Sequence, residues 1–111
     1  MRYYLIDELY EEDIKRIESA LREQGYTGGI EGIFYLPVPE DMLTDEQREH
    51  LEKCGPYILS LETGDTWLKM ELLVRARNML RCSCLAYAAP ALRAHMIDFL
   101  DRFIRELDIP V

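Results

Sequence analysis

Four of the five cysteine and histidine side chains in this sequence could together bind zinc: His50, Cys54, Cys82 and Cys84. Zinc in proteins is held by a tetrahedron of thiolate sulfurs and imidazole nitrogens, and three cysteines with one histidine are one of its usual ligand sets. His50 and Cys54 are four residues apart, so they would share one face of a helix. These residue types and this spacing make zinc binding one hypothesis for the chain.

The spacing of Cys82 and Cys84 favours a different interpretation. We expect this segment to be a strand, in which side chains two residues apart on one face stand roughly 7 Å apart. Two thiolates on one zinc ion, each with a Zn–S bond of about 2.3 Å, must approach within roughly 4 Å. We therefore predict that both cysteines are small core residues under the last helix, with no metal ion and no cofactor.

Other candidate features for catalysis have simpler structural explanations. The Gly28–Gly32 loop follows a predicted helix and precedes a strand, whereas a phosphate-binding loop joins a strand to a helix N-terminus. Thr44 and Gln47 predict a capping box at the start of the helix expected at 44–55, and the acidic residues around that start suit a helix N-terminus. His95 lies in the last predicted helix, and no Ser or Cys stands at a recognisable nucleophile position. We expect a non-enzymatic protein; the alternative is an enzyme or ligand-binding protein with a pocket near the Gly28–Gly32 loop.

Length and charge limit the class of protein. The 111 residues, 49% of them apolar, suffice for a single domain over 1–111 with a core of its own. With 21 acidic and 13 basic residues the net charge is -8, which argues against a nucleic-acid-coating protein. No apolar run approaches the ~20 residues of a membrane span. The acidic residues from Asp7 onward argue against a secretory signal, and three cysteines without scaffold spacing favour a reducing, cytoplasmic setting.

Apolar periodicity and turn residues predict the element order β-α-β-α-β-β-β-α. Strands are expected at 3–6 and 33–38, and helices at 7–24, 44–55 and from Pro90 to about 107. The first and last helices have enough apolar surface to cover one face of a sheet. The pattern therefore predicts a two-layer α+β fold with a mostly antiparallel sheet and helices mainly on one face.

Residues 57–87 are expected to form a three-stranded meander. Gly64 and Asp65 suit a two-residue type II′ turn that pairs Leu61 with Leu68. A three-residue loop at 76–78 then sets the register of the third strand, because it keeps apolar residues on one face. The cross-strand pairs this predicts are Val74–Leu80, Leu72–Cys82, Met70–Cys84 and Leu68–Ala86.

The sheet face away from the helices is the predicted working surface. The register places Trp67 beside Tyr87 on that face and gives it more aromatic and arginine side chains than a solvent-exposed face needs. Residues 67–95 carry 5 basic and 1 acidic side chain, against 6 basic and 16 acidic in 1–66. We expect a homodimer or an acidic protein partner there, unless the second helix or the Gly28–Gly32 loop covers the face. The predicted binding residues are Trp67, Lys69, Leu73, Arg75, Arg77, Arg81 and Tyr87.

Overall fold

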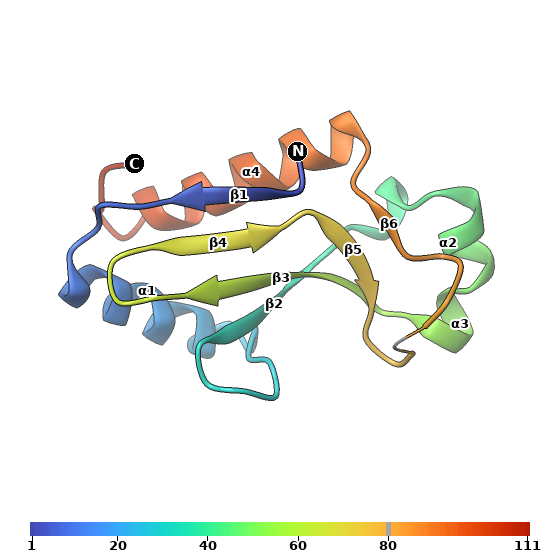
Figure 1. The fold of residues 1–111 in the computed structure, drawn as a ribbon, viewed down its shortest axis with the longest axis horizontal. Coiled ribbons are helices and arrows are strands. Elements are labelled where there is room, and N and C mark those ends of the chain that lie inside the picture. The colour runs from blue at the N-terminus through green and yellow to red at the C-terminus, as the bar shows by residue number, and fades with distance from the viewer. Residues whose placement is uncertain (80) are drawn as a thin grey trace.

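The computed structural model of the protein describes residues 1–79 and 81–111. Its order of helices and strands follows the predicted one, with extra breaks in the second helical region and in the meander. The elements are β1 (Tyr3–Ile6), α1 (Glu11–Glu23), β2 (Ile33–Pro37), the 3-10 turn η1 (Glu40–Met42), α2 (Asp45–Glu49), α3 (Leu51–Cys54), β3 (Tyr57–Thr63), β4 (Leu68–Glu71), β5 (Leu73–Ala76), β6 (Ala86–Tyr87) and α4 (Pro90–Arg105) (Figure 1).

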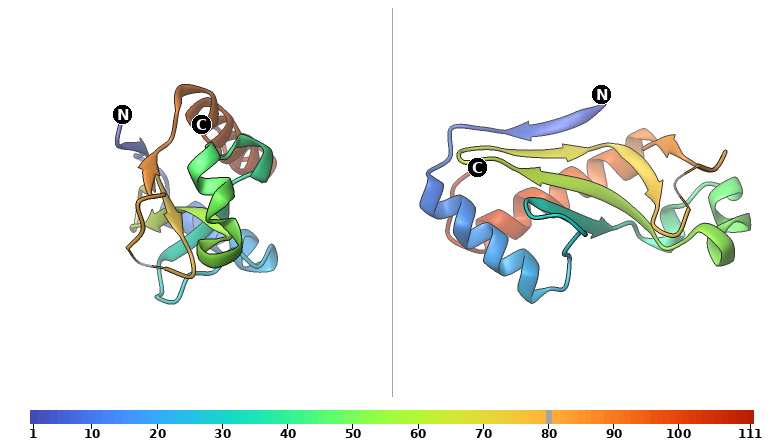
Figure 2. Two further views of the ribbon diagram at one scale, coloured as in Figure 1. Left: turned by 90° about the vertical axis from the view of Figure 1, so that its right-hand side faces the viewer. Right: turned by 60° about the horizontal axis from the view of Figure 1, so that its bottom comes forward.

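The fold has two layers. The long helices α1 and α4 pack on one face of the sheet, while α2 and α3 lie beyond the end of the sheet where β5 stops (Figures 1 and 2). Apolar side chains at helical spacing on α1 and α4 meet the inward-facing side chains of the sheet. This confirms the predicted two-layer α+β fold. The core includes Ile14, Ile17, Leu21, Leu59, Leu61, Leu68, Met70, Leu72, Met96, Leu100 and Ile104.

The antiparallel sheet is built around β3, which pairs with β2 on one side and with both β4 and β5 on the other. β4 and β5 are one run of chain interrupted at Leu72, where the neighbouring strand changes. The Leu72 N–H donates to the Arg2 carbonyl at 2.9 Å, and the Leu72 carbonyl accepts from the Ala88 N–H at 2.7 Å. As a result, β1 lies beside β4 and β6 lies beside β5, along the same edge of the sheet.

The hairpin register between β3 and β4 differs from the prediction by two residues. Leu61 pairs with Met70, and the Gly64 N–H donates to the Trp67 carbonyl at 2.9 Å, so the loop residues are Asp65 and Thr66. A Cβ on Gly64 would lie only 2.1 Å from the Trp67 indole, so the glycine makes room for that ring. A shift of two residues leaves every side chain on its predicted face, because the side-chain period of a strand is two.

The predicted third strand of the meander is mostly absent. The run over β3, β4 and β5 is confirmed, but of residues 81–87 only Ala86 and Tyr87 form a strand, and they pair with Val74 and Leu73. The expected pairs Leu72–Cys82, Met70–Cys84 and Leu68–Ala86 are therefore wrong, while Leu80 lies outside the described residues. The physical reason is competition: β1 occupies the position beside β4 that the third strand was expected to fill.

The helix expected at 44–55 is divided into α2 and α3 at His50. Its predicted capping box is confirmed, with the Thr44 N–H donating to Gln47 Oε1 at 2.9 Å and the Gln47 N–H donating to Thr44 Oγ1 at 3.1 Å. Within the described ranges, no helix combines the length and apolar content needed to cross a membrane.

Candidate metal centre

The ligand atoms of His50, Cys54, Cys82 and Cys84 all lie within 4.8 Å of one another, and we refer to these residues as the Cys3His cluster. Cys82 is at its centre, with its Sγ 2.8 Å from Cys84 Sγ, 3.5 Å from Cys54 Sγ and 3.1 Å from His50 Nδ1. Tetrahedral zinc with bonds of about 2.3 Å holds its sulfurs about 3.8 Å apart. The cluster thus has the donor set and nearly the size of a zinc site.

The prediction that a strand keeps Cys82 and Cys84 apart is wrong. Residues 82–85 form a turn, in which the Leu85 N–H donates to the Cys82 carbonyl at 3.2 Å. The turn brings both thiols to the same side, and the Cys84 N–H points at Cys82 Sγ at 3.4 Å. A backbone N–H aimed at sulfur favours the thiolate, which is the form that binds metals. Cys84 is nonetheless buried, as predicted.

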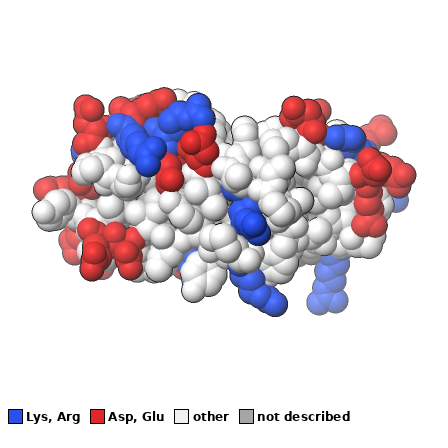
Figure 3. Space-filling view, turned by 90° about the horizontal axis from the view of Figure 1, so that it is seen from above, with Lys and Arg blue, Asp and Glu red and all other residues white. Residues whose placement is uncertain are grey.

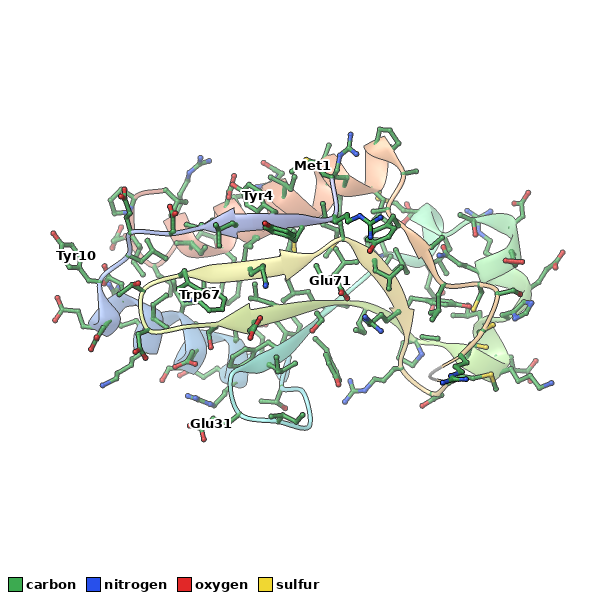
Figure 4. The ribbon with its side chains drawn as sticks, viewed as in Figure 1. Met1, Tyr4, Tyr10, Glu31, Trp67 and Glu71 are labelled. Carbon is green, nitrogen blue, oxygen red and sulfur yellow. The ribbon has the colours of Figure 1, made fainter. Side chains whose placement is uncertain are left out.

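α2 and α3 supply the other two donors. The His50 carbonyl accepts from the Cys54 N–H at 2.7 Å, and this turn of helix places the His50 ring and the Cys54 thiol on one face. Their Nδ1 and Sγ atoms are 4.0 Å apart. Sulfur atoms from α3 and from the loop before β6 gather at this end of the molecule (Figure 4). The cluster therefore joins two segments that are far apart in the sequence.

A second set of contacts holds the backbone of the cluster in place. Gln47, whose side chain is almost fully buried, donates from Nε2 to the Cys84 carbonyl at 3.1 Å. The Tyr57 hydroxyl donates to the Gln47 carbonyl at 2.8 Å. On the other side, the Asn78 N–H donates to the Cys54 carbonyl at 3.1 Å and Asn78 Nδ2 donates to the Gly55 carbonyl at 2.6 Å. Such outer contacts fix the orientation of metal ligands. The sequence alone predicts only the capping role of Gln47.

The three thiols differ in acidity. Hydrogen bonds from the Cys84 thiol, and then from its backbone N–H, lower the pKa of Cys82 to about 7. Burial, with smaller contributions from the neighbouring thiols, raises the pKa of Cys54 to about 11 and also raises the pKa of Cys84. Cys82, whose pKa is the only one of the three that is lowered, is therefore the thiol that ionises first.

With four protein donors, a tetrahedral ion here would have no position left for water or substrate. Catalytic zinc sites keep such a position open, whereas structural sites are closed. Cys54 and Cys84 are each only 1% exposed, so these two donors face away from solvent, while His50 and Cys82 are half-buried. The arrangement is thus suited to a structural role.

The predicted binding residues lie elsewhere, most of them on the sheet face not covered by α1 or α4. We call this surface the open face; it includes Tyr3, Tyr35, Ser60, Trp67, Lys69, Glu71, Leu73, Arg75 and Tyr87 (Figure 4). Tyr3 and Tyr35 were not predicted for this face, because the sequence predicts the strands at 3–6 and 33–38 but not their neighbours in the sheet. Arg77 lies at the border of the open face with its guanidinium 5.3 Å from the Tyr35 ring centre, while Arg81 lies in the loop between β5 and β6.

The basic side chains of the open face contact an acidic side chain or an aromatic ring. Arg75 forms a two-bond contact with Glu71, at 2.6 and 3.2 Å. The Lys69 ammonium lies 5.4 Å from the Tyr3 ring centre and 5.9 Å from that of Trp67. The expected Trp67–Tyr87 neighbourhood is wrong, because Tyr87 pairs with Leu73 and its ring lies against Arg2. A shallow hollow of ≈ 440 Å³ opens beside Arg75.

A second hollow, of ≈ 300 Å³, lies at the Gly28–Gly32 loop that the alternative hypothesis singled out. Its charged lining residues are Arg22 and Glu31. Two such groups make neither a nucleophile–base pair nor a metal ligand set. The hollow therefore adds no support to the enzyme alternative.

Comparison of this chain with protein families, with curated proteins and with solved structures found no significant match. The site is therefore interpreted from its own geometry.

Proposed function

We propose that this protein is a small zinc-binding domain in which the Cys3His cluster holds one structural zinc ion. The observation that carries the proposal is that all four ligand atoms lie within 4.8 Å of one another, although they come from two segments of the chain. Three soft thiolates with one imidazole are a donor set that zinc prefers over magnesium or calcium, which select oxygen. Three free cysteines also suit a reducing compartment such as the cytoplasm.

The role of the zinc ion would be to fasten the loop between β5 and β6 onto α2 and α3. These helices are short, and an isolated helix of this length is not stable in water. Because a site of this kind is assembled only in the folded chain, the free energy of metal binding contributes to folding. The metal would thus stabilise the end of the molecule that has the least regular structure.

Elemental analysis of the purified protein tests the proposal. We expect one zinc ion per chain, and after exchange into cobalt the visible spectrum of a tetrahedral thiolate site. Cys82→Ser should lose the metal, because Cys82 contacts the other three donors. Ser83→Ala, which changes the same turn without removing a donor, should retain it. A metal-free protein whose thiols are all reduced would overturn the proposal.

The open face supports a second candidate function, the non-enzymatic binding of a protein partner. Neither long helix covers it, and it gathers aromatic rings beside basic groups (Figure 4). Exposed patches of this composition are typical of interface cores. We propose an acidic segment as the partner, either of another protein or of a second copy of this chain.

Emission from Trp67 offers a test of the open face, since it is the only tryptophan in the chain. Titration with a glutamate-rich peptide should change that emission, and Arg77→Glu should weaken binding roughly tenfold by reversing a charge at the border of the face. Arg93→Glu on α4 changes the net charge equally and should have little effect. Equal weakening by both variants would mean that the peptide responds only to net charge.

A further inference from the structure

The outer edge of β1 is unpaired in the part of the chain that the structure describes. β1 stands at the end of the sheet, with β4 on its inner side only (Figure 1). At the opposite edge β2 is covered, because the Tyr35 N–H donates to the Tyr26 carbonyl at 2.7 Å and Thr27 bridges to Phe34. Viewed from the β1 side, acidic side chains gather towards the two ends of the molecule, while the middle is mostly uncharged apart from a few basic groups (Figure 3).

The backbone of β1 presents hydrogen-bonding groups to this edge. The Arg2 carbonyl accepts from the Leu72 N–H at 2.9 Å, so Arg2, Tyr4 and Ile6 direct their backbone groups towards β4. Alternation along an antiparallel strand then directs the N–H and C=O groups of Tyr3 and Leu5 outward. These four groups have no hydrogen-bond partner within the described ranges.

β1 also lacks the features by which proteins usually prevent strand addition. Edge strands are commonly protected by lysine, proline or a bulge. Residues 3–6 read Tyr-Tyr-Leu-Ile, with no charged residue, glycine or proline. Tyr3 and Leu5 are 53% and 45% exposed. The edge therefore offers both backbone groups and apolar surface.

We propose that β1 binds an extended segment of a partner protein, which adds to the sheet as an antiparallel strand. This proposal does not depend on the metal site or on a partner bound to the open face, although the Tyr3 side chain belongs to that face. Strand addition draws its affinity from main-chain hydrogen bonds and its specificity from alternate side chains. Four such bonds are available, to the N–H and C=O groups of Tyr3 and Leu5.

The position of α4 argues for a lone strand rather than a second copy of this chain. α4 runs directly behind β1 (Figures 1 and 2), and the Tyr4 hydroxyl donates to Asp101 on that helix at 2.7 Å. Two copies paired through β1 about a twofold axis would bring their two α4 helices into the same space, because paired strands lie only about 5 Å apart while packed helices need roughly 8–10 Å. A segment without a helical layer meets no such obstacle.

Charges at the two ends of β1 select the partner sequence. Arg2 precedes the strand, whereas Asp7 and Glu8 follow it. An antiparallel partner passes Asp7 first and Arg2 last, so it should begin with a basic residue and end with an acidic one. Its residues opposite Ile6 and Tyr4 face the helical layer and should be apolar. A capped peptide Lys-Val-Thr-Val-Thr-Glu meets these requirements, with its threonines opposite Leu5 and Tyr3.

Fluorescence anisotropy of the labelled peptide measures its binding to the protein. The variable in this test is methylation of backbone amides in the peptide. N-methylation of the first threonine removes an N–H that would face β1 and should weaken binding at least roughly tenfold. N-methylation of the second valine, whose N–H would face away, should change it less than about threefold. The peptide with its Lys and Glu exchanged should bind more weakly. Absence of binding, or equal effects of the two methyl groups, would overturn the proposal.

Variants of the protein locate the site. Leu5→Pro removes an outward N–H while leaving the groups of Tyr4 and Ile6 that pair with β4, and it should abolish peptide binding. Ile30→Lys, at another highly exposed apolar residue, should leave binding unchanged. Circular dichroism confirms that both variants fold; if Leu5→Pro does not, Leu5→Lys replaces it with the same expectation. Self-association of the wild type that Leu5→Lys abolishes would show that a second copy is the occupant and would overturn the choice of partner.

Discussion

Cys82 is the residue whose surroundings in the structure differ most from those that the predicted strand would give it. Its sulfur contacts three other potential ligand atoms, whereas a regular strand would have separated it from Cys84. The sequence contains all four donors, and their types alone suggested zinc. The turn at 82–85 has only a weak signal in the sequence, because Cys-Ser-Cys-Leu contains neither glycine nor proline and Ser83 is its one residue that favours turns.

Gln47→Glu tests the outer contacts of the metal site. The carboxylate can still accept from the Thr44 N–H, but it cannot donate to the Cys84 carbonyl and it adds negative charge near three thiolates. Loss of an outer contact of this kind lowers metal affinity by about 10- to 100-fold. Competition with a zinc chelator measures the change.

Glu46→Gln is the matched control for Gln47→Glu, since Glu46 is exposed on the same helix. It should leave zinc affinity unchanged. If Gln47→Glu binds zinc as tightly as the wild type, the contact with Cys84 does not position the metal ligand.

Tyr4 should give a pH-dependent contribution to stability. Burial, together with the hydrogen bond to Asp101, raises the pKa of Tyr4 from 10.0 to about 12. The folded state thus favours the protonated phenol, so its contribution is complete below pH 10.0 and is lost as the pH rises towards about 12. Tyr4→Phe removes the hydrogen bond and should cost about 0.5–1.5 kcal/mol at neutral pH.

Urea unfolding of the wild type and of Tyr4→Phe, measured across this pH range, checks the prediction. The difference in unfolding free energy between the two proteins should shrink as the phenol ionises. A difference that stays constant up to high pH would mean that the hydroxyl contact with Asp101 does not stabilise the fold.

At the scale of the elements, predictions succeeded where local pattern decides and failed where distant segments compete. Apolar spacing placed α1 and α4, and Thr44 with Gln47 marked the start of α2. The hairpin register was wrong by two residues, yet the faces were right. The third meander strand failed because β1, which is distant in the sequence, pairs with β4. No local signal in residues 79–87 reports that competition.

Gly64→Ala tests the packing of the β3–β4 hairpin. A Cβ at this position would lie 2.1 Å from the Trp67 indole, so either the ring or the turn must move. We expect a destabilisation of roughly 1–3 kcal/mol, as for other overpacked sites. Thermal or urea unfolding measures it.

The same substitution in a Trp67→Leu background separates the steric cause from a backbone cause. If the indole is responsible, the second substitution should recover most of the loss, which appears as coupling in a double-mutant cycle. Additive effects would instead place the cost of Gly64→Ala in the backbone of the turn.

At the scale of the whole molecule, the metal site lies at one end of the core. Most of the largest buried side chains belong to α1, α4 and the sheet, while the Cys3His cluster lies among α2, α3 and the loop before β6, where Cys54 and Cys84 join the same core (Figures 1 and 4). The sequence composition predicted a core of sufficient size, and most of its buried residues come from elements outside the cluster. Stability is therefore expected to be uneven along the molecule.

Removal of zinc with a chelator should loosen one end of the molecule and leave the rest folded. Amide hydrogen exchange should become faster in α2, α3 and residues 81–88, because these segments lose their common ligand. The amides of β3 and β4 should stay protected, since the two strands pair with each other and share a core with the apolar side chains of α1 and α4. Mass spectrometry of peptides after exchange measures both regions.

Cys54→Ser is a genetic counterpart of chelation and should give the same pattern, because it removes one of the four donors. Loss of protection in β3 and β4 as well would mean that the metal holds the whole fold together.

The change of neighbour at Leu72 has a consequence for the order in which the chain folds. The Leu72 N–H donates to the Arg2 carbonyl near the start of the chain, and the Leu72 carbonyl accepts from the Ala88 N–H in the segment that leads into α4. The β3–β4 hairpin needs only a short loop to close. In contrast, residues 7–67 separate β1 from β4 in the sequence, and contacts between residues far apart in the sequence form slowly. Contacts within the hairpin are thus expected in the transition state, with β1 joining after it. Changes in the hairpin would then slow folding, and changes in β1 would speed unfolding.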